Sequence, residues 1–313
     1  MISKLSIAYL LQFDDDTLPL TEAMLEAMPL TEYAAEHWIV HAKSGVMDHN
    51  GLQLILCLFT SGSAPFKNWI RIYNIDDWGK QKYWGKRNRL MDGDEVCSAL
   101  YYSSLAGMEE VSDYLLQVGE NANAEGGRLG NPLQAASCEG YEVNVKLLLE
   151  NGAKVNAEGG FYGNALQAAS YSGHEAIVKL LLENGAEVNA KGGVNGNALH
   201  AALNGGNEAI VKLLLENGAE VNADDGHYGN ALQAASIRGN EAIVKLLLEN
   251  GAEVNAKGGV YGNALYIASD RDNEAMVKLL LENGAEVNAE GGDYGNALQA
   301  ASCSGPPVAM RQL

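Results

Sequence analysis

The sequence predicts an all-α fold: a solenoid of stacked helix-turn-helix-hairpin units preceded by a small helical region. The main observation is a strict repeat, because GNALQAAS or a near copy begins at six positions, each 33 residues after the last: Gly130, Gly163, Gly196, Gly229, Gly262 and Gly295. A fixed period of this length indicates a stacked array in which each unit contacts its neighbours. A second observation is the apolar block at helical spacing inside the units.

The unit from Gly163 to Asn195 shows how one layer is built. Asn164, followed by Gln167, has the spacing of a capping box that begins a short first helix. Small residues follow, and Gly173 can adopt the left-handed conformation that ends this helix. Residues 175–183 then predict a second helix, with Glu and Lys side chains spaced for ion pairs on its outer side. A glycine-rich hairpin leads to the next unit.

The second half of the unit is the more specific signature. LLLENGAEVNA stands at residues 180–190, 213–223, 246–256 and 279–289 without an insertion between the copies. With the helix pair, this pattern resembles the ankyrin repeat over residues 97–305. The chain carries NALQ or a near copy where common ankyrin repeats have Thr-Pro-Leu-His, and paired glycines replace the hairpin Asp. This variant is similar to the ankyrin tail of fungal NACHT-type, NLR-like proteins.

The repeat register predicts two domains, 1–96 and 97–313. Units begin near residues 97, 130, 163, 196, 229, 262 and 295. The unit at 97–129 is degenerate but in register, which suits an N-terminal cap of the array. The last unit is incomplete, so we expect Leu298 to lack the cover of a second helix.

The region 1–96 lies outside the repeat period and contains all four tryptophans. Residues 5–13, 30–42 and 52–59 are predicted to be helical, with Thr31 as the cap of the second of these helices. PLTEYAAEHWIVHA at 29–42 is similar to a helical stretch between the NACHT module and the ankyrin tail of the fungal proteins. CSALYYSSLAGMEEVSDYLL at 97–116 resembles the opening of their first repeat.

Composition restricts the class of partner. The formal net charge is −19 over 313 residues, with 47% hydrophobic and 19% charged residues. This acidity argues against nucleic acid or an anionic membrane as a partner and favours a protein with a basic surface. No apolar run has the length of a membrane span. Four scattered cysteines favour a reducing, cytoplasmic setting, with the nucleus as the open alternative. The residues carry no signal for an oligomeric state.

No catalytic motif is recognised, so we predict that the chain is not an enzyme and needs no cofactor or metal. A nucleotide-hydrolysing loop needs Gly-Lys-Ser/Thr, whereas this chain has GKQ at 79–81 and GKR at 85–87. The NACHT engine of the resembled proteins is therefore not expected here. His37 and His41 have the spacing of a metal-binding pair, but Trp38 stands where a zincin has Glu. We interpret both histidines as structural.

A basic and aromatic stretch occupies residues 67–89. Seven Lys and Arg residues alternate with Trp and Tyr side chains, a composition also used for nucleic-acid surfaces. We favour docking of this stretch against the acidic repeats of the same chain, or simple solvation.

Because the copies are nearly identical, the positions that differ between units are the candidate partner-binding residues. They lie at the hairpin tips and at the exit of the first helix, where aromatic and Arg side chains make good anchors. The recurring tip tyrosines have a competing role in packing one tip onto the next. The candidates are Arg128, Phe161, Tyr162, Tyr171, Val194, Asn195, His200, His227, Tyr228, Arg238, Tyr261, Tyr266, Arg271 and Tyr294.

The sequence therefore predicts a protein-protein interaction scaffold or sensor that presents a concave acidic surface. By resemblance, its setting would be the sensor end of a fungal NLR-like signalling protein. Two alternatives stay open: a regulatory or inhibitory subunit of a catalytic partner, and a fragment of a larger NLR-like protein.

Overall fold

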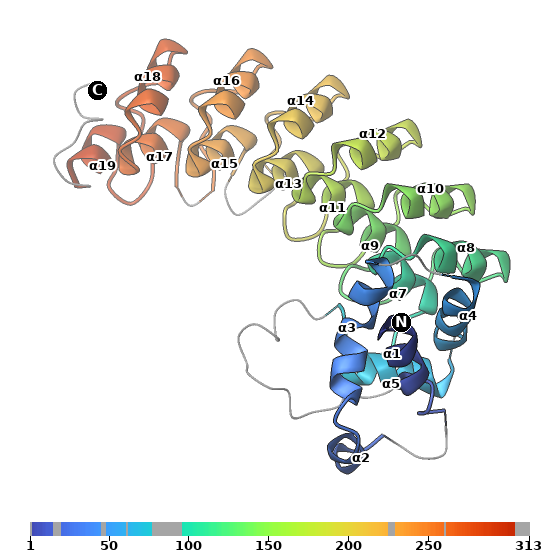
Figure 1. Ribbon diagram of the computed structural model, residues 1–313. Helices are drawn as coiled ribbons and strands as arrows, with labels where there is room; N and C mark the ends of the chain where they lie inside the picture. The colour runs from blue at the N-terminus through green and yellow to red at the C-terminus, as the bar shows by residue number, and fades with distance from the viewer. Residues whose placement is uncertain are drawn as a thin grey trace. The chain divides into compact units, whose positions relative to one another are not determined.

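The computed structural model describes residues 2–14, 20–44, 48–60, 62–76, 96–224, 229–259 and 261–303 (Figure 1). Within these ranges the regular elements are helices, and β-type pairing is limited to isolated bridges in the hairpins. The predicted all-α repeat fold is therefore confirmed. The chain divides into two compact units, residues 1–154 and 155–313.

In the described part of the first unit, five helices lie outside the repeat. They are α1 (Ile2–Leu10), α2 (Glu22–Ala27), α3 (Thr31–Lys43), α4 (His49–Leu58) and α5 (Ala64–Ile72). The three helices expected here are present as α1, α3 and α4, with shifted ends, whereas α2 and α5 were not predicted. The expected cap role of Thr31 is wrong: Leu30 is the N-cap residue, and the Thr31 hydroxyl donates to the Met28 carbonyl at 2.7 Å.

An aromatic core holds these helices together. The Trp38 and Trp69 side chains are fully buried, with ring centroids 5.2 Å apart. The Trp69 indole N–H donates to the Ala35 carbonyl at 3.0 Å, which satisfies the polar atom of this ring. Phe66 and Trp69 also approach Tyr102 of the first repeat, with ring centroids 5.9 and 6.3 Å apart. The aromatic core of region 1–96 is thus continuous with the first repeat.

Two repeats complete the first unit. The first repeat contains α7 (Ala99–Leu105) and α8 (Glu109–Gln117), and the second contains α9 (Pro132–Glu139) and α10 (Glu142–Glu150). The side chains of Ser98 and Asn131 cap α7 and α9 by accepting hydrogen bonds from backbone amides. Gly140 then ends α9 in the left-handed conformation, at φ 85°.

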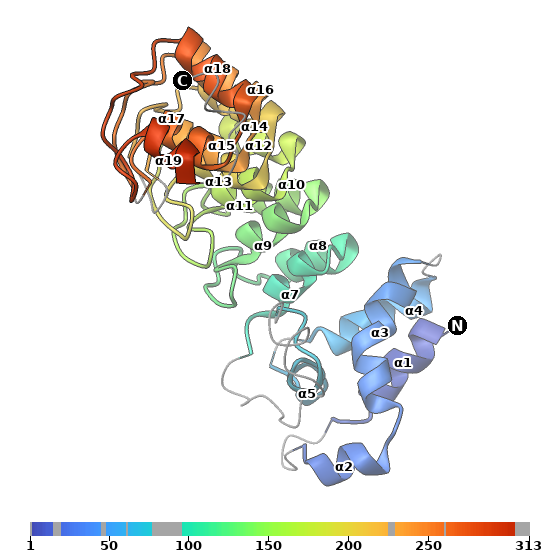
Figure 2. The same cartoon turned by 90° about the vertical axis from the view of Figure 1, so that its left-hand side faces the viewer.

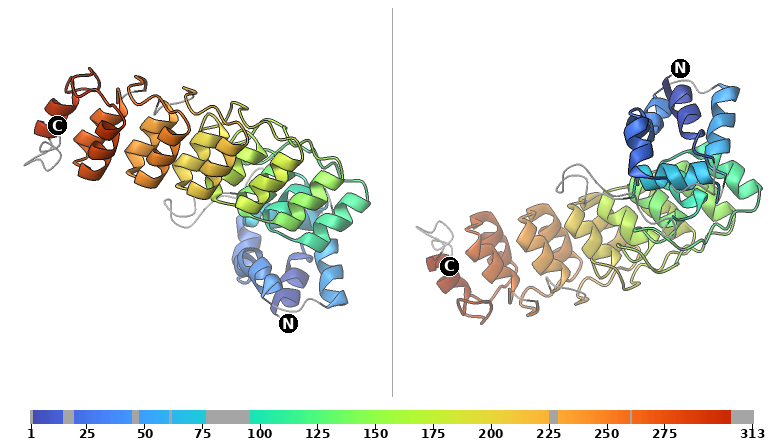
Figure 3. Two further views of the ribbon diagram at one scale, coloured as in Figure 1. Left: turned by 90° about the horizontal axis from the view of Figure 1, so that it is seen from above. Right: turned by 90° about the horizontal axis from the view of Figure 1, so that it is seen from below.

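The second unit is a regular stack of helix pairs. Its helices are α11 (Ala165–Ser172), α12 (Glu175–Glu183), α13 (Ala198–Gly205), α14 (Glu208–Glu216), α15 (Ala231–Arg238), α16 (Glu241–Glu249), α17 (Ala264–Asp270), α18 (Glu274–Glu282) and α19 (Ala297–Cys303). The first helices of the pairs pack in one row and the second helices in another, as Figure 2 and Figure 3 show. The hairpins project on the side of the first helices (Figure 2).

Only one of the two hydrogen bonds of the expected capping box is present at the start of α11. Asn164 accepts a hydrogen bond from the Gln167 amide at 2.9 Å, as predicted. The Gln167 side chain does not return to its own cap: its Nε2 donates to the Ala190 and Gly196 carbonyls at 2.9 and 3.3 Å. Asn230 and Gln233 form the complete box at the start of α15. The repeated Gln therefore also ties the first helix to the hairpin that follows its own helix pair.

Five asparagines, four of them in VNA motifs and Asn123 in ANA, link neighbouring repeats. Asn189 Nδ2 donates to the Gly218 carbonyl at 3.0 Å, and its Oδ1 accepts from the Glu220 amide at 2.9 Å. The same two bonds recur at the equivalent asparagines, Asn123, Asn156, Asn222 and Asn255. Sequence analysis did not identify this ladder, although the repetition of VNA carried its signal.

We expect Asn189→Ala to lower the free energy of unfolding by about 1–3 kcal/mol, because it removes two hydrogen bonds between repeats. Thermal unfolding followed by circular dichroism should show a melting temperature lower by about 5 °C. Glu187→Ala, which retains the backbone amide that bonds to Asn156, is the matched control and should change stability little. Equal melting temperatures for Asn189→Ala and the unmodified chain would contradict the role of the ladder.

The last described helix exposes an apolar side chain, as expected for Leu298. Leu298 of α19 is 40% exposed, whereas the equivalent Leu265 of α17 is buried. Leucine at this repeat position is therefore buried in α17 and exposed in α19.

The described residues show neither a membrane-spanning helix nor a disulfide. None of the described helices combines the length and apolar composition needed to cross a bilayer. Cys57, Cys97 and Cys138, the cysteines with described side chains, form no disulfide with one another.

Candidate partner-binding surface

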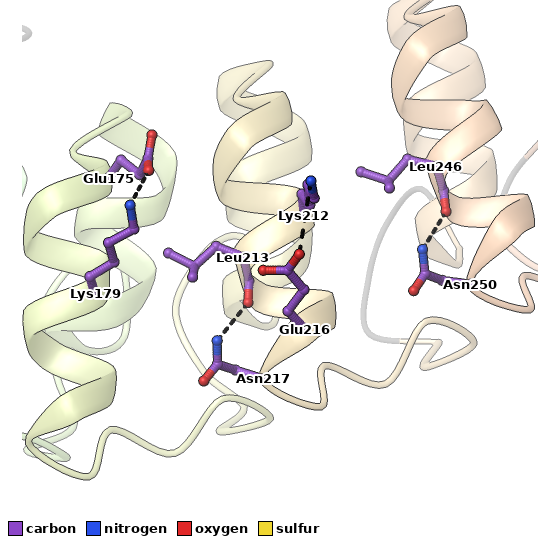
Figure 4. Close-up of polar contacts among 8 residues, drawn as sticks. All are labelled: Glu175, Lys179, Lys212, Leu213, Glu216, Asn217, Leu246 and Asn250. Carbon is purple, nitrogen blue, oxygen red and sulfur yellow. Dashed lines mark hydrogen bonds and ion pairs between the residues drawn. The ribbon is translucent and has the colours of Figure 1, made fainter.

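On the outer side of the second helices, the polar side chains pair with one another or with the backbone of the same helix. Lys179 pairs with Glu175 at 2.5 Å, and Lys212 pairs with Glu216 at 3.9 Å (Figure 4). At the helix ends, Asn217 and Asn250 donate to carbonyls of the preceding turn at 2.8 Å (Figure 4). This near-identical pattern offers little chemistry that distinguishes one repeat from the next.

The hairpin before α11 carries an aromatic cluster. The Phe161 and Tyr162 ring centroids lie 5.0 Å apart in an edge-on arrangement, and Tyr162 and Tyr171 lie 5.1 Å apart. Phe161 and Tyr171 are 37% and 38% exposed, whereas Tyr162 is buried beside both. The buried ring therefore supports two rings that face solvent in part.

The next hairpin extends this cluster toward the following repeats. The Val194 amide donates to the Phe161 carbonyl at 3.1 Å, and the Val194 side chain is 60% exposed. Asn195 accepts a hydrogen bond from Asn204 Nδ2 at 2.9 Å. Arg238 in turn donates to Asn204 Oδ1 at 3.5 Å, so these contacts connect residues of three consecutive repeats.

Four of the candidate residues are buried in the stack: Tyr162, Asn195, His200 and Tyr266. The His200 ring nitrogens lie 3.1 Å from Asn197 Oδ1 and 3.0 Å from the Gly229 carbonyl oxygen. The Tyr266 hydroxyl accepts from the Tyr294 amide at 3.3 Å, and burial raises the pKa of this hydroxyl. Such contacts give these side chains a packing role, so the candidates that remain open to a partner are the exposed ones.

The remaining candidates are spread over other repeats. Arg128, Arg271 and Tyr294 are exposed, and Tyr261 is half-buried. His227 and Tyr228 lie outside the described residues. The structure therefore brings Phe161, Tyr171, Val194, Asn195 and Arg238 into one connected group, and it leaves Arg128 in the other unit.

Asp76 is a buried carboxylate that sequence analysis missed. Its Oδ2 accepts a hydrogen bond from the Arg128 backbone amide at 2.5 Å, and the Tyr101 hydroxyl accepts from the Leu129 amide at 3.2 Å. Burial raises the pKa of the Asp76 carboxyl, and the Arg128 hydrogen bond opposes that rise. Burial and the Asp76 charge likewise raise the pKa of Tyr101 above its usual range. Both side chains hold the first hairpin in place.

The two histidines of α3 lie on one side of the helix, with ring centroids 6.4 Å apart. The Tyr33 hydroxyl lies 3.0 Å from His41 Nε2, and the Tyr33 ring lies edge-on to His37 at 4.6 Å. Within the described ranges, no group of three His, Cys, Asp or Glu side chains has the arrangement of a metal site. Of the basic stretch at 67–89, only residues 67–76 are described.

Comparisons with known proteins agree with this architecture. The sequence profile described as "Ankyrin repeats (3 copies)" matches residues 131–192, 166–258 and 224–291, together more than half of the chain. The chain belongs to the ankyrin-repeat family. Ankyrin repeats generally mediate protein-protein interactions, and the fold is typically a non-enzymatic interaction module.

Two solved ankyrin repeat domains illustrate the structural similarity. The human ASB11 ankyrin repeat domain aligns with a TM-score of 0.62 and 27% identity, covering 69% of this chain and 96% of that one. The ankyrin repeat domain of Bcl-3, a member of the IkappaB protein family, aligns with a TM-score of 0.57 and 26% identity, covering 64% and 92%.

A curated relative is the azaphilone pigments biosynthesis cluster protein L of Monascus ruber. It is 36% identical over 144 residues, which is 43% of this chain and 30% of the relative. The similarity thus spans less than a third of that protein's length.

Proposed function

We propose that this ankyrin-repeat chain is a non-enzymatic scaffold or sensor that binds a protein partner through the residues that vary between repeats. The observation that carries the proposal is the division of labour within the second unit. The repeated Asn189 and Gln167 side chains bond to the Gly218 and Gly196 carbonyls, which belong to the repeat that follows, whereas the varying Phe161, Tyr171 and Val194 side chains are exposed. A change in the exposed side chains alters what the surface binds, while the repeated Asn and Gln side chains keep the repeats stacked.

The proposed role of region 1–96 is to cap the first repeat of domain 97–313. Besides the aromatic contacts to Tyr102, Lys43 donates to the Tyr141 hydroxyl at 2.9 Å and lies 4.4 Å from the centre of its ring. The Asp76 bond to the Arg128 amide adds a contact to the first hairpin. Burial of the first repeat by helices of a different kind supports a cap.

The biological setting that we propose is the sensor or scaffold end of a fungal NLR-like signalling protein, in the cytoplasm or nucleus. The support is the sequence similarity of the repeat variant and of residues 29–42 to such proteins. The net charge of −19 supports a concave acidic surface and a protein partner that is basic overall. A regulatory subunit of a catalytic partner is the second candidate, since the same surface would serve to hold an enzyme.

Affinity capture tests the proposal. The full chain, immobilised and exposed to a fungal lysate, should retain a discrete protein that mass spectrometry identifies. The variant Phe161→Ala with Tyr171→Ala should retain about tenfold less of it, since exposed aromatic anchors dominate interface energies. Lys245→Ala, on the outer side of α16, is the matched control and should retain as much as the unmodified chain. Equal capture by the double variant would contradict the proposed surface.

A further inference from the structure

We propose that one strip of the second unit binds an extended peptide segment in which an aromatic or aliphatic side chain precedes an acidic one. We name this strip by its residues, Phe161, Tyr171, Val194, Asn195, Asn204 and Arg238. The inference rests on the proposed interaction function and specifies the chemistry of the partner.

The apolar end of the strip is formed before any partner arrives. Tyr162 holds Phe161 at 5.0 Å and an interplanar angle of 88°, and it holds Tyr171 at 5.1 Å. Gly193 lies against Tyr162: an added Cβ at Gly193 would stand 2.1 Å from the Tyr162 carbonyl carbon, so the two hairpins are in direct contact. Rings held in this way lose little conformational entropy when an apolar side chain binds.

The middle of the strip holds a buried amide whose donor is unsatisfied. Arg238 is donor-only, so its contact with Asn204 fixes Oδ1 of that amide toward the guanidinium and Nδ2 toward Asn195. Asn195 Oδ1 is therefore used as an acceptor, and its Nδ2 has no hydrogen-bond partner in the described residues. The Asn195 side chain is only 8% exposed. An unpaired buried donor is costly, and because Nδ2 is enclosed, the Asn195 side chain must turn toward the surface before a carbonyl or carboxylate of the bound segment can satisfy it.

Asn195 is also an exception in its column of the repeat. The equivalent hairpin position holds tyrosine at 162, 228, 261 and 294. The first repeat has Leu129 there, so Asn195 is the polar exception, and it lies next to the exposed aromatic pair. We therefore assign Asn195 to recognition through its amide group.

The cationic end of the strip is Arg238. It is exposed, its chain neighbours Ile237 and Gly239 are uncharged, and no ion pair to it occurs within the described ranges. The lysines of the second helices are instead paired with glutamates: Lys146, Lys179, Lys212, Lys245 and Lys278. Arg271 is not part of the strip, because its chain neighbours Asp270 and Asp272 are acidic and offset its charge. A guanidinium of this kind binds carboxylates in a planar, paired geometry.

The spacing of the strip sets the spacing of the ligand. Tyr171 and Arg238 belong to repeats two steps apart, and packed helices lie about 8–10 Å apart. An extended peptide rises about 3.3 Å per residue, so the apolar and acidic side chains should stand about five or six residues apart. The acidity of the whole chain disfavours an acidic tract, which predicts a single Asp or Glu in an otherwise neutral or basic segment.

Selection from a phage-displayed library of random peptides, each about 12 residues long to span the strip when extended, tests this inference. Selected peptides should share an aromatic or aliphatic residue followed by Asp or Glu. Arg238→Glu should exchange that acidic preference for Lys or Arg, and Phe161→Ala with Tyr171→Ala should weaken a selected peptide about tenfold or more. The control Lys245→Ala should select the same peptides as the unmodified chain.

Two results would overturn the inference. Selected peptides whose binding is unchanged by Arg238→Glu and by the double variant would place the site elsewhere while leaving the interaction function intact. A library that yields no peptide above background, combined with no protein captured from the lysate, would overturn the proposed function as well. Circular dichroism of each variant distinguishes a lost contact from a lost fold.

Discussion

Removal of residues 196–228 should leave a chain that still folds into a helical stack, whereas removal of residues 196–210 should not. The whole-repeat deletion brings Gly251 into the place of Gly218, so that Asn189 regains a carbonyl of the same kind. Gly229 likewise replaces Gly196 as an acceptor for Gln167. The partial deletion removes α13 and leaves most of α14, whose apolar side then has no first helix to cover it.

Circular dichroism and size-exclusion chromatography check this difference. The whole-repeat deletion should retain the helical signal per residue and elute as a soluble species, because the stability of a stacked array depends on contacts between neighbours. The partial deletion should lose helical signal or aggregate. Equal loss of helix in both chains would show that the repeats do not act as interchangeable layers.

Trp69→Ala should destabilise the helical region by about 3–5 kcal/mol, the range for truncating a buried large aromatic side chain. Trp69 is fully buried against Trp38, and its indole N–H occupies the Ala35 carbonyl. The ring also approaches Tyr102 of α7, so the loss should extend to the first repeat. Urea unfolding followed by tryptophan fluorescence gives the free energy.

The matched control for this prediction is Val40→Ala on α3. Val40 is largely exposed, so we expect a change of about 0.5 kcal/mol or less. Hydrogen exchange should show faster exchange in α7 for Trp69→Ala and unchanged exchange in α16. Unchanged exchange in α7 would contradict the proposed role of region 1–96 as a cap of the first repeat.

The repeat helices were predictable because their signals are local. The Asn cap, the small residues and the left-handed glycine of a unit lie within a few residues of one another, and Asn164 and Gly173 have the predicted geometry. The side-chain bonds of Gln167 and Asn189 to distant backbone groups were missed because those groups lie 23 to 31 residues away. Helix α5 was missed because its second half lies in the stretch 67–89, which was interpreted by its charge.

The candidate surface was predictable in position but not in exposure. Comparison of the copies identifies the hairpin tips and the exit of the first helix, and Phe161, Tyr171 and Val194 there are exposed. The same comparison selects His200 and Tyr266, which are buried because the neighbouring repeat covers them. Asp76 lies outside the repeats, so the comparison of copies carried no signal for it.

The central claim is that repeated residues hold the stack and varying residues bind the partner. The direct test measures both the melting temperature and the affinity for one captured protein, in Asn189→Ala and in Phe161→Ala with Tyr171→Ala. We predict a lower melting temperature with unchanged affinity for the first variant, and about tenfold weaker binding with an unchanged melting temperature for the second. A parallel loss of stability and affinity in both variants would contradict the account.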